Sequence, residues 1–357
     1  MTSAETIFLT GFPGFIAGRL LKRLANNDRR FLLLVQPALV ALAQSQIRKI
    51  TEETGRAPKS FQILEGDITQ TDFGLSPLYL EKARAETNTI FHLAALYDLS
   101  VSRETAMRVN VAGTRNVNVF ARSLKDLRRY HYVSTCYVAG KRSGRILESE
   151  LEHEAGFRNY YEETKYLAEI EVAALKNELP VTIHRPAVVC GDSLTGETAK
   201  YDGIYYLINY LLKWAGVLTL FNIGNREVSL NLVPIDFVVE AMAALAEDER
   251  AVGKTVQLAD PDPLSTYELF NTIARSIKQR GSLITIPARL VEFSLMLPPA
   301  PRITDLPHHG VPYFFLRQTY DTSLAQDLLE PHGIRCPPFA SYADTIVGYA
   351  ARHPVPG

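Results

Sequence analysis

Residues 6–18 read Thr-Ile-Phe-Leu-Thr-Gly-Phe-Pro-Gly-Phe-Ile-Ala-Gly and connect a short apolar run to a helical pattern. A strand, a glycine turn and a helix in this order favour a dinucleotide-binding site over an ordinary strand–helix connection. Gly11 permits the tight turn, and Gly14 lets the backbone approach a pyrophosphate at the helix start. The sequence therefore predicts nucleotide contacts from Gly11, Phe12, Pro13, Gly14, Phe15 and Ile16.

The first half of the chain alternates short apolar runs with longer helical patterns, which is typical of βαβ units and a parallel sheet. The predicted strands are 6–10, 31–35, 61–64, 89–93, 130–135 and 181–184. The predicted helices are 15–26, 39–54, 77–85, 105–124 and 161–178. We therefore predict an α/β fold with a doubly wound parallel sheet, the Rossmann arrangement, over residues 1–186.

After residue 186 the pattern becomes irregular, with turn residues at 191–203 and a proline-rich stretch at 287–312. We predict that residues 187–357 form mostly a smaller, substrate-binding lobe. The chain is expected to return to the main domain near 230–260, because the apolar runs 230–233 and 255–258 could each extend the main sheet.

The composition indicates a globular chain with no strong charge bias. The formal net charge of the 357 residues is −1, which gives no reason to expect nucleic acid or an anionic membrane as a partner. Three scattered cysteines argue against a disulfide framework and favour a reducing compartment. No apolar run approaches the ~18 residues of a membrane span, and the N-terminus lacks a basic start. We expect a cytoplasmic protein with no membrane span.

Tyr161 and Lys165 lie four residues apart in a helical pattern, so their side chains share one face. A lysine there lowers a phenol pKa that is normally about 10, so the tyrosine can exchange a proton with a carbonyl or an alcohol. Ser134 and Thr135 end a predicted strand, at the edge of the sheet that faces the ligand. We predict that Thr135, or less favourably Ser134, hydrogen-bonds the substrate oxygen, while Lys165 also holds the nicotinamide ribose. Simple filling of the strand is the alternative for both hydroxyls.

A second pair, Tyr137 and Lys141, has the same spacing. This pair directly follows a strand and contains Gly140, which favours a loop. Two side chains in a loop need not share a face, so we predict Tyr161 and Lys165 as the catalytic pair.

The choice of cofactor depends on the end of the predicted second strand. Many NAD sites place an acid there to bind the ribose hydroxyls, but this strand is followed by Gln36. Because a missing carboxylate removes repulsion against a 2′-phosphate, we predict NADP, with NAD as the alternative. Asp67 and Ile68 follow the third strand and are placed to meet the adenine. For Asp67, a solvated turn residue is the alternative.

The sequence resembles the extended short-chain dehydrogenase/reductase family over about residues 6–236. The motifs that carry the resemblance are 10–15, 66–68, 92–95, 110–114, 133–135, Tyr161 with Lys165, and 185–186. The resemblance implies that Asn110 lies on the helix behind the active site. It implies further cofactor contacts from Leu93, Ala94, Ala95, Pro186, Val188 and Val189. Ser134 is also counted among the cofactor contacts.

Within that family, residues 133–140 and 185–193 are similar to the thioester and fatty-acyl reductases, the male-sterility-like branch. In that branch the hydroxyl partner is a threonine, here Thr135, and an arginine often stands in place of Gln36. The resemblance implies NAD(P)H-dependent reduction of a carbonyl, most readily an acyl thioester or a fatty-acyl-derived aldehyde, with Tyr161 as proton donor. It also implies CoA or a carrier protein as the thioester's carrier, and a homodimer through the helices 105–124 and 161–178.

Three other functions fit parts of the pattern. A ketone or sterol-type reductase and a nucleotide-sugar epimerase or dehydratase would use the same tyrosine and lysine. A nucleotide-sensing regulator would not need them, and the intact set Thr135, Tyr161 and Lys165 argues against it.

Two remaining signals are weaker. Residues 201–221 are rich in aromatic and aliphatic side chains, which would suit an acyl pocket, a core between lobes or, less favourably, docking on a membrane surface. His308 and His309 have no matching ligand spacing, so we predict no metal site.

Overall fold

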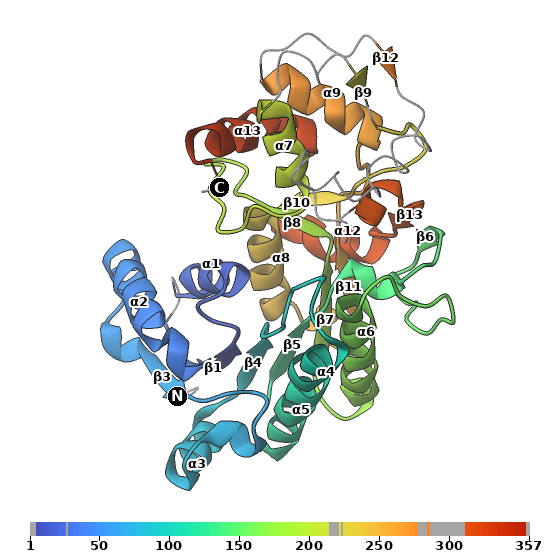
Figure 1. The fold of residues 1–357 in the computed structure, drawn as a ribbon. Coiled ribbons are helices and arrows are strands. Elements are labelled where there is room, and N and C mark those ends of the chain that lie inside the picture. Colours follow the sequence, from blue (N-terminus) through green and yellow to red (C-terminus); the bar gives the residue numbers. More distant parts are fainter. Residues whose placement is uncertain are drawn as a thin grey trace.

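Seven parallel strands form the central sheet (Figure 1). The computed structural model describes residues 5–25, 28–213, 221–222, 224–277, 284–285 and 311–354. The strands, in their order across the sheet, are β11 (Thr255–Leu258), β7 (Val181–Pro186), β5 (Arg129–Val133), β4 (Thr89–His92), β1 (Glu5–Thr10), β2 (Arg29–Val35) and β3 (Phe61–Glu65). From β1 the chain adds strands toward one edge of the sheet, as far as β3, and from β4 it adds them toward the other edge. The strand order therefore reverses between β1 and β4, and the predicted doubly wound Rossmann arrangement is confirmed.

Helices cover both faces of this sheet, and an apolar core fills each side. On one face lie α1 (Phe15–Leu24), α2 (Val40–Thr54) and α8 (Ile235–Glu247). On the other face lie α3 (Pro77–Glu86), α5 (Gly113–Ser123) and α6 (Tyr160–Ala173). The strands are mostly apolar because helices cover both faces of the sheet.

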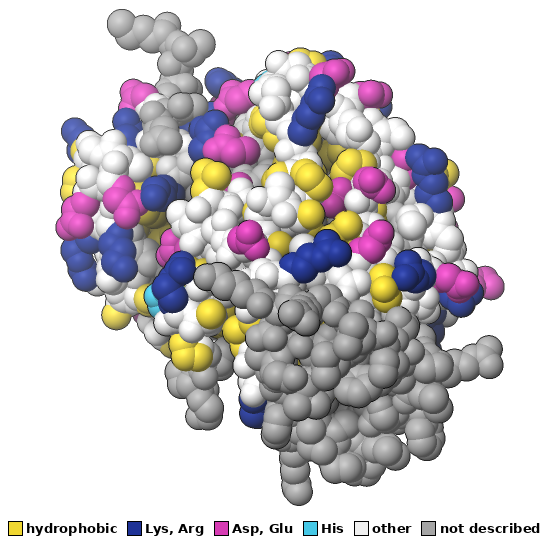
Figure 2. Space-filling model, turned by 90° about the horizontal axis from the view of Figure 1, so that it is seen from above, with side chains coloured by type: hydrophobic (Ala, Val, Ile, Leu, Met, Phe, Trp, Pro, Cys, Tyr) yellow, Lys and Arg dark blue, Asp and Glu magenta, His cyan; other side chains and the backbone are white. Residues whose placement is uncertain are grey.

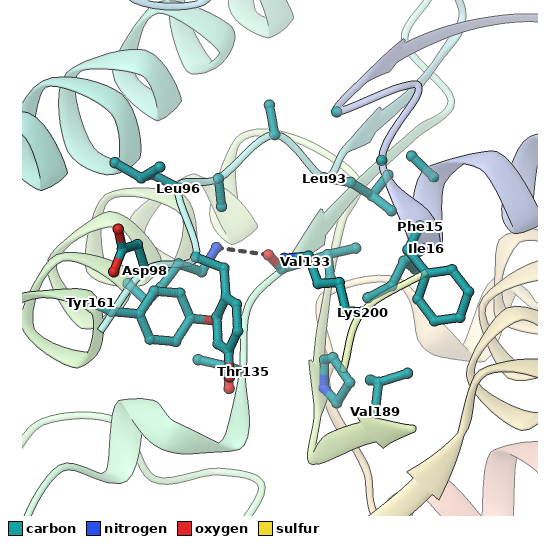
Figure 3. A pocket seen from close by; sticks show the side chains of 18 of the residues that line it. Phe15, Ile16, Leu93, Leu96, Asp98, Val133, Thr135, Tyr161, Val189 and Lys200 are labelled. Carbon is teal, nitrogen blue, oxygen red and sulfur yellow. Dashed lines mark hydrogen bonds between the residues drawn. The ribbon is translucent and has the colours of Figure 1, made fainter. Parts of the chain in front are cut away.

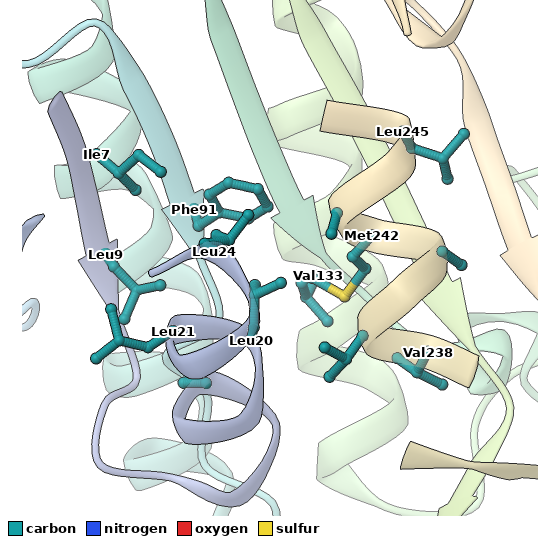
Figure 4. Packing of buried hydrophobic residues seen from close by; sticks show 14 of the residues in the cluster. Ile7, Leu9, Leu20, Leu21, Leu24, Phe91, Val133, Val238, Met242 and Leu245 are labelled. Carbon is teal, nitrogen blue, oxygen red and sulfur yellow. The ribbon is translucent and has the colours of Figure 1, made fainter. Parts of the chain in front are cut away.

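The contact between α1 and α8 shows how the first core is built. Leu20 and Leu21 both lie beside Leu24 on one side of α1, because positions three and four residues apart are neighbours on a helix. Figure 4 shows these leucines beside β1 and β4, with Met242 of α8 facing Val133 of β5. This packing fixes the start of α1, and therefore the glycine turn, against the ends of the strands.

A second lobe lies beyond the carboxyl ends of the strands, at the top of Figure 1. Its core joins α7 (Ile204–Lys213), α9 (Thr266–Ser276) and α13 (Ala343–Arg352). α9 begins with a capping box, in which the Ser265 hydroxyl accepts from the Glu268 N–H and the Glu268 carboxylate accepts from the Ser265 N–H.

Three short two-stranded ladders connect distant parts of the chain. They are β8 (Val188–Cys190) with β10 (Leu232–Pro234), β9 (Phe221–Asn222) with β12 (Ile284–Thr285), and β6 (Gly144–Ile146) with β13 (Gln318–Tyr320). The prediction that 230–233 extends the main sheet is therefore wrong, because β10 pairs with β8 instead. The prediction that 255–258 extends the main sheet is confirmed, since β11 pairs with β7. After β13, α12 (Ser323–Leu329) also returns to pack against β11 and α8.

The surface carries mixed charge. On the face shown in Figure 2, basic and acidic side chains are interspersed. None of the helices in the described ranges has both the length and the apolarity that crossing a bilayer would require.

Candidate active site

A cavity of about 830 Å³ opens at the carboxyl ends of the central strands. Its floor is formed by the ends of β1, β4, β5 and β7 and by the start of α1, and the second lobe covers the other side (Figure 3). In open α/β sheets, ligands bind at this edge, beside the point where the strand order reverses. The cavity is therefore the candidate active site.

The glycine turn at one end of the cavity has the shape that a pyrophosphate needs. Gly11 has φ +90°, and a Cβ there would lie 2.8 Å from the backbone N of Ala94. A Cβ on Gly14 would lie 2.6 Å from the Gly11 carbonyl oxygen. No side chain caps the start of α1, and its first turn contains no acid. The first N–H groups of α1 are thus left for a phosphate, so the turn fits a dinucleotide.

The end of the cavity where the sequence predicts the adenosine contains a contact that the sequence did not reveal. The Gln36 amide Nε2 donates to Asp67 Oδ2 at 3.0 Å, and Asp67 Oδ1 accepts from the Thr69 N–H at 2.8 Å. A carboxylate therefore lies beside the end of β2, although it comes from the end of β3. Of the cavity-lining residues that the structure describes, the only lysines or arginines are Lys165 and Lys200.

The predicted catalytic residues meet at the end of the cavity where the sequence predicts the nicotinamide. Tyr161 lies in the first turn of α6, and the Thr135 side chain hydrogen-bonds its phenol. The Thr135 hydroxyl accepts from the Tyr137 N–H at 3.2 Å, which leaves its own proton free to donate. Figure 3 shows Thr135 and Tyr161 on the same side of the cavity, and Tyr97 packs edge-on against the Tyr161 ring at 4.9 Å. The arrangement places one acidic hydrogen and one hydrogen-bond donor where a carbonyl oxygen can reach both.

Lys165 lies on the same face of α6 but contacts β5. Its ammonium donates to the Tyr132 hydroxyl at 2.9 Å and to the Val133 carbonyl oxygen at 2.8 Å. Burial lowers the pKa of Lys165 to about 7, and the nearby Glu169 carboxylate opposes that shift. The prediction that Lys165 lowers the pKa of Tyr161 is wrong for this structure, because burial raises that pKa and only the bond from Thr135 lowers it. Tyr161 is therefore a protonated acid at neutral pH.

Asn110 lies behind the site, as the resemblance implied. It sits in a π-helical segment (Met107–Ala112) between α4 (Arg103–Ala106) and α5. Its Oδ1 accepts from the Leu96 N–H at 2.7 Å, and its Nδ2 donates to the Thr164 hydroxyl at 3.0 Å. The buried amide thus connects the cavity-lining loop after β4 to the helix that carries Tyr161.

Most residues predicted from the sequence are brought together by the fold. The predicted residues that line the cavity are Gly11, Phe12, Gly14, Phe15, Ile16, Gln36, Ile68, Leu93, Ala94, Ala95, Ser134, Thr135, Tyr161, Lys165, Pro186, Val188 and Val189. Pro13 and Asp67 are not among the lining residues. The Pro13 carbonyl accepts from Gln46, and Asp67 reaches the site only through Gln36.

The second tyrosine–lysine pair is separated by a loop. Tyr137 lies in a 3-10 turn (Cys136–Ala139) and lines the cavity, whereas Lys141 is exposed and follows Gly140, which has φ +57°. The prediction that these side chains need not share a face is consistent with this geometry.

The apolar segment 201–221 contributes little to the cavity. Tyr205, Leu207, Ile208 and Leu211 are buried in the core of the second lobe, which supports the core interpretation for them. Trp214 and residues 215–220 lie outside the described residues, as do His308 and His309. Among the described residues no group of three or more His, Cys, Asp or Glu is placed to hold a metal ion.

Several cavity residues were not predicted as site residues. They are Leu96, Tyr97, Asp98, Tyr137, Thr198, Lys200, Asp202, Tyr206, Leu230, Tyr313 and Phe314. Leu96, Tyr97 and Asp98 directly follow the predicted contact Ala95, so extending that segment would have found them. Tyr313 comes from a distant part of the chain, and no local pattern marks it. Its hydroxyl also anchors the start of α6, since it donates to Glu162 at 2.7 Å and accepts from Asn159 at 2.6 Å.

A Rossmann sheet, a phosphate-binding glycine turn and an adjoining threonine, tyrosine and lysine define an NAD(P)-dependent oxidoreductase of the extended short-chain dehydrogenase/reductase type. Residues 9–242 match the family model described as male sterility protein. That match covers more than half of the sequence, and the chain belongs to this family.

Three known proteins show the range of the similarity. The chain is 26% identical to glycine betaine reductase ATRR of Emericella nidulans over 76% of its own length and 22% of that protein. It is 25% identical to fatty acyl-CoA reductase wat of Drosophila melanogaster over 68% of its length and 54% of that protein. The terminal R domain of the myxalamid PKS-NRPS pathway has a TM-score of 0.81 and 26% identity, covering 99% of this chain and 92% of that one. The chain thus spans about half, or less, of the two curated relatives.

Proposed function

We propose that the protein is an NAD(P)H-dependent reductase of carbonyl compounds, most readily of an acyl thioester or of the aldehyde derived from it. The hydrogen-bonded pair of Thr135 and Tyr161 at the nicotinamide end of the cavity carries this proposal. The relatives named as a fatty acyl-CoA reductase and as a terminal R domain support the thioester as substrate.

The bound dinucleotide would supply a hydride to the carbonyl carbon. Thr135 donates a hydrogen bond to the carbonyl oxygen, and Tyr161 transfers its proton to that oxygen as negative charge develops there. The Lys165 ammonium has three N–H donors, and Tyr132 and Val133 take two of them, so the third would hold the nicotinamide ribose. On a thioester, cleavage of the carbon–sulfur bond then releases the thiol and leaves an aldehyde. A second reduced dinucleotide would supply the hydride for reduction of that aldehyde to an alcohol, with Tyr161, reprotonated from solvent, again as the proton donor.

The test is a panel of an acyl-CoA thioester, the matching aldehyde, a ketone and a nucleotide sugar. We expect the thioester to oxidise the reduced cofactor and to release CoA, which a thiol reagent measures. A ketone or sterol-type reductase would oxidise the cofactor with the ketone alone. An epimerase or dehydratase would convert the nucleotide sugar with no net oxidation, and either result would replace the proposal. CoA and carrier-protein thioesters of one acyl group would then identify the carrier.

We further propose that NAD(H) is preferred to NADP(H), contrary to the prediction from the sequence. That prediction depended on the absence of a carboxylate at the end of β2, and Asp67 supplies one from β3. With its amide N–H directed to Asp67, Gln36 offers a carbonyl oxygen, which accepts from a ribose hydroxyl but not from a phosphate. Like charge between Asp67 and a 2′-phosphate would weaken NADP(H) binding.

The activity should depend on pH through Lys165. Tyr161 stays protonated because burial raises its pKa, whereas the pKa of Lys165 is about 7. We expect kcat/KM for the reduced cofactor to be highest below about pH 7 and to fall above it, as the ammonium loses its proton. A pH profile of initial rates measures this, since kcat/KM reports the free enzyme.

Lys176 provides the control for this profile. Burial lowers its pKa to about 8, but it contacts the Thr255 hydroxyl and does not line the cavity. The break in the profile is the pH above which kcat/KM falls, and the variant K176M should keep it. A profile with no break near pH 7, or a break that moves in K176M, contradicts the assignment to Lys165.

A homodimer through α4, α5 and α6 stays a proposal. The pairs Arg103–Glu163 and Arg115–Glu171 join α4 and α5 to α6 on their exposed side, and Arg122 of α5 pairs with Glu178, which follows α6. Size-exclusion chromatography with light scattering would decide the oligomeric state.

A further inference from the structure

One buried carboxylate, that of Glu169, connects three elements of the active site. Glu169 lies on α6, one turn after Lys165, and is 1% exposed. Its Oε1 accepts from Arg185 Nε of β7 at 2.8 Å and from Arg185 Nη2 at 2.5 Å. Its Oε2 accepts from the Ser134 hydroxyl at the end of β5. All three side chains are buried, so water does not compete for these bonds.

Each of these partners is directly beside a residue of the site. Ser134 precedes Thr135, and Arg185 precedes Pro186, which lines the nicotinamide end of the cavity. Lys165 is one helical turn from Glu169 on the same face of α6. The three elements that must meet at the substrate oxygen and the nicotinamide are thus joined at one point. We propose that Glu169 is a positioning residue, which holds Thr135, Lys165 and the loop after β7 in register for hydride and proton transfer.

The same contact explains why the Ser134 hydroxyl is not the substrate's partner. The hydroxyl has one proton, and that proton is donated to Glu169. Among the described residues no carboxylate takes the Thr135 proton, so this hydroxyl is free to donate to Tyr161 or to a substrate. Glu169 therefore also decides between the two hydroxyls that the sequence left open.

Glu169 has a second effect, on the charge of Lys165. The groups that face the Lys165 ammonium are the Tyr132 hydroxyl of β5, His92 of β4, and Glu169 on its own helix. Burial lowers the pKa of His92, so that imidazole is neutral. The Glu169 carboxylate raises the Lys165 pKa against the effect of burial, and it therefore favours the protonated lysine.

The substitution E169Q tests this proposal, which depends on the proposed reductase function for its kinetic part. Glutamine keeps the shape and removes the charge. Without that charge the Lys165 pKa should fall by about one unit or more. The break in kcat/KM should move to lower pH, with about fivefold lower kcat/KM at pH 7 from the lost protonation alone. Misplacement of Thr135 should lower kcat further.

Two companion variants keep the test decisive. E171Q removes a glutamate two residues along α6, which pairs with Arg115 on the exposed side, and should leave the profile unchanged. Because E169Q leaves the Arg185 guanidinium buried without its counter-charge, the double variant E169Q/R185M is measured beside it. The double variant should recover thermal stability but keep the shifted break.

A binding measurement separates this proposal from the proposed function. The Kd of the reduced dinucleotide is followed across pH by its fluorescence, with no substrate present. We expect the pH at which binding weakens to be lower in E169Q and in the double variant than in the natural protein and in E171Q. If all four proteins share one midpoint, Glu169 does not act on Lys165, whatever substrate the enzyme reduces.

Discussion

Replacing Tyr161 with phenylalanine is expected to lower kcat by about 10²–10⁴-fold, because the reaction loses its proton donor. The Tyr161 side chain is buried, and its ring packs edge-on against Tyr97 at 4.9 Å. Phenylalanine keeps that ring contact, so the fold and the cavity should be unchanged. Cofactor affinity should stay within a few-fold, since Lys165 and the glycine turn are untouched. Steady-state rates and the fluorescence of the bound reduced cofactor measure the two effects.

The neighbouring tyrosines supply matched controls. Tyr160 precedes Tyr161 on α6 but is 45% exposed and does not line the cavity, so Y160F should keep full activity. Tyr137 lines the cavity beside Tyr313, and Y137F should alter substrate affinity more than kcat. Turnover that survives Y161F and disappears in Y137F would overturn the assignment of the proton donor.

The sheet was predictable because its signal is local. Each central strand is covered on both faces, so each one appears as a mostly apolar run. The short strand β10 is equally apolar, yet it pairs with β8 in the second lobe and not with the main sheet. A run of three residues indicates a buried strand but says nothing about its partner, which depends on contacts 44 residues away between Leu232 and Val188.

The site was predictable to the extent that it lies at strand ends. Thr135 and Lys165 could be placed because strand, turn and helix spacing determine where they point. The charge state of the site could not, because it depends on burial and on long-range contacts. Lys165 donates to Tyr132 and Val133 of β5, which occupies the ammonium and leaves the Tyr161 pKa to burial. The segment that contains Tyr313 reaches the site from 152 positions after Tyr161, and no pattern announces that contact.

Gln36 and Asp67 show the same limit in a form that can be tested. Neither residue alone predicts a carboxylate at the end of β2, but the fold brings Asp67 Oδ2 to 3.0 Å from Gln36 Nε2. If Asp67 sets the preference for NAD(H), the natural protein should bind NADH more tightly than NADPH. Direct titration with each reduced cofactor measures this, independently of any substrate.

The variant Q36R should then reverse the preference for NADH over NADPH, most strongly in combination with D67N. A guanidinium at position 36 can bind a phosphate bidentately, and a hydrogen bond to a charged group contributes about 1.5–3 kcal/mol. The NADPH Kd should therefore fall by about 10–150-fold in Q36R/D67N, while the NADH Kd changes little. Asp67 would compete for the new arginine in the single variant, so Q36R alone should show a smaller gain.

The uncharged variant Q36M is the control for this series, because methionine has a similar length but can neither donate a hydrogen bond to a phosphate nor attract it by charge. Q36M should weaken the binding of NADH, because the carbonyl acceptor of Gln36 is lost, and it should not strengthen the binding of NADPH. A natural protein that already binds NADPH more tightly than NADH would contradict the role given to Asp67. In that case a 2′-phosphate must be held by groups other than the two lysines that line the described part of the cavity. Lys165 contacts β5, and Lys200 lies over the ring of Tyr97, which packs against Tyr161.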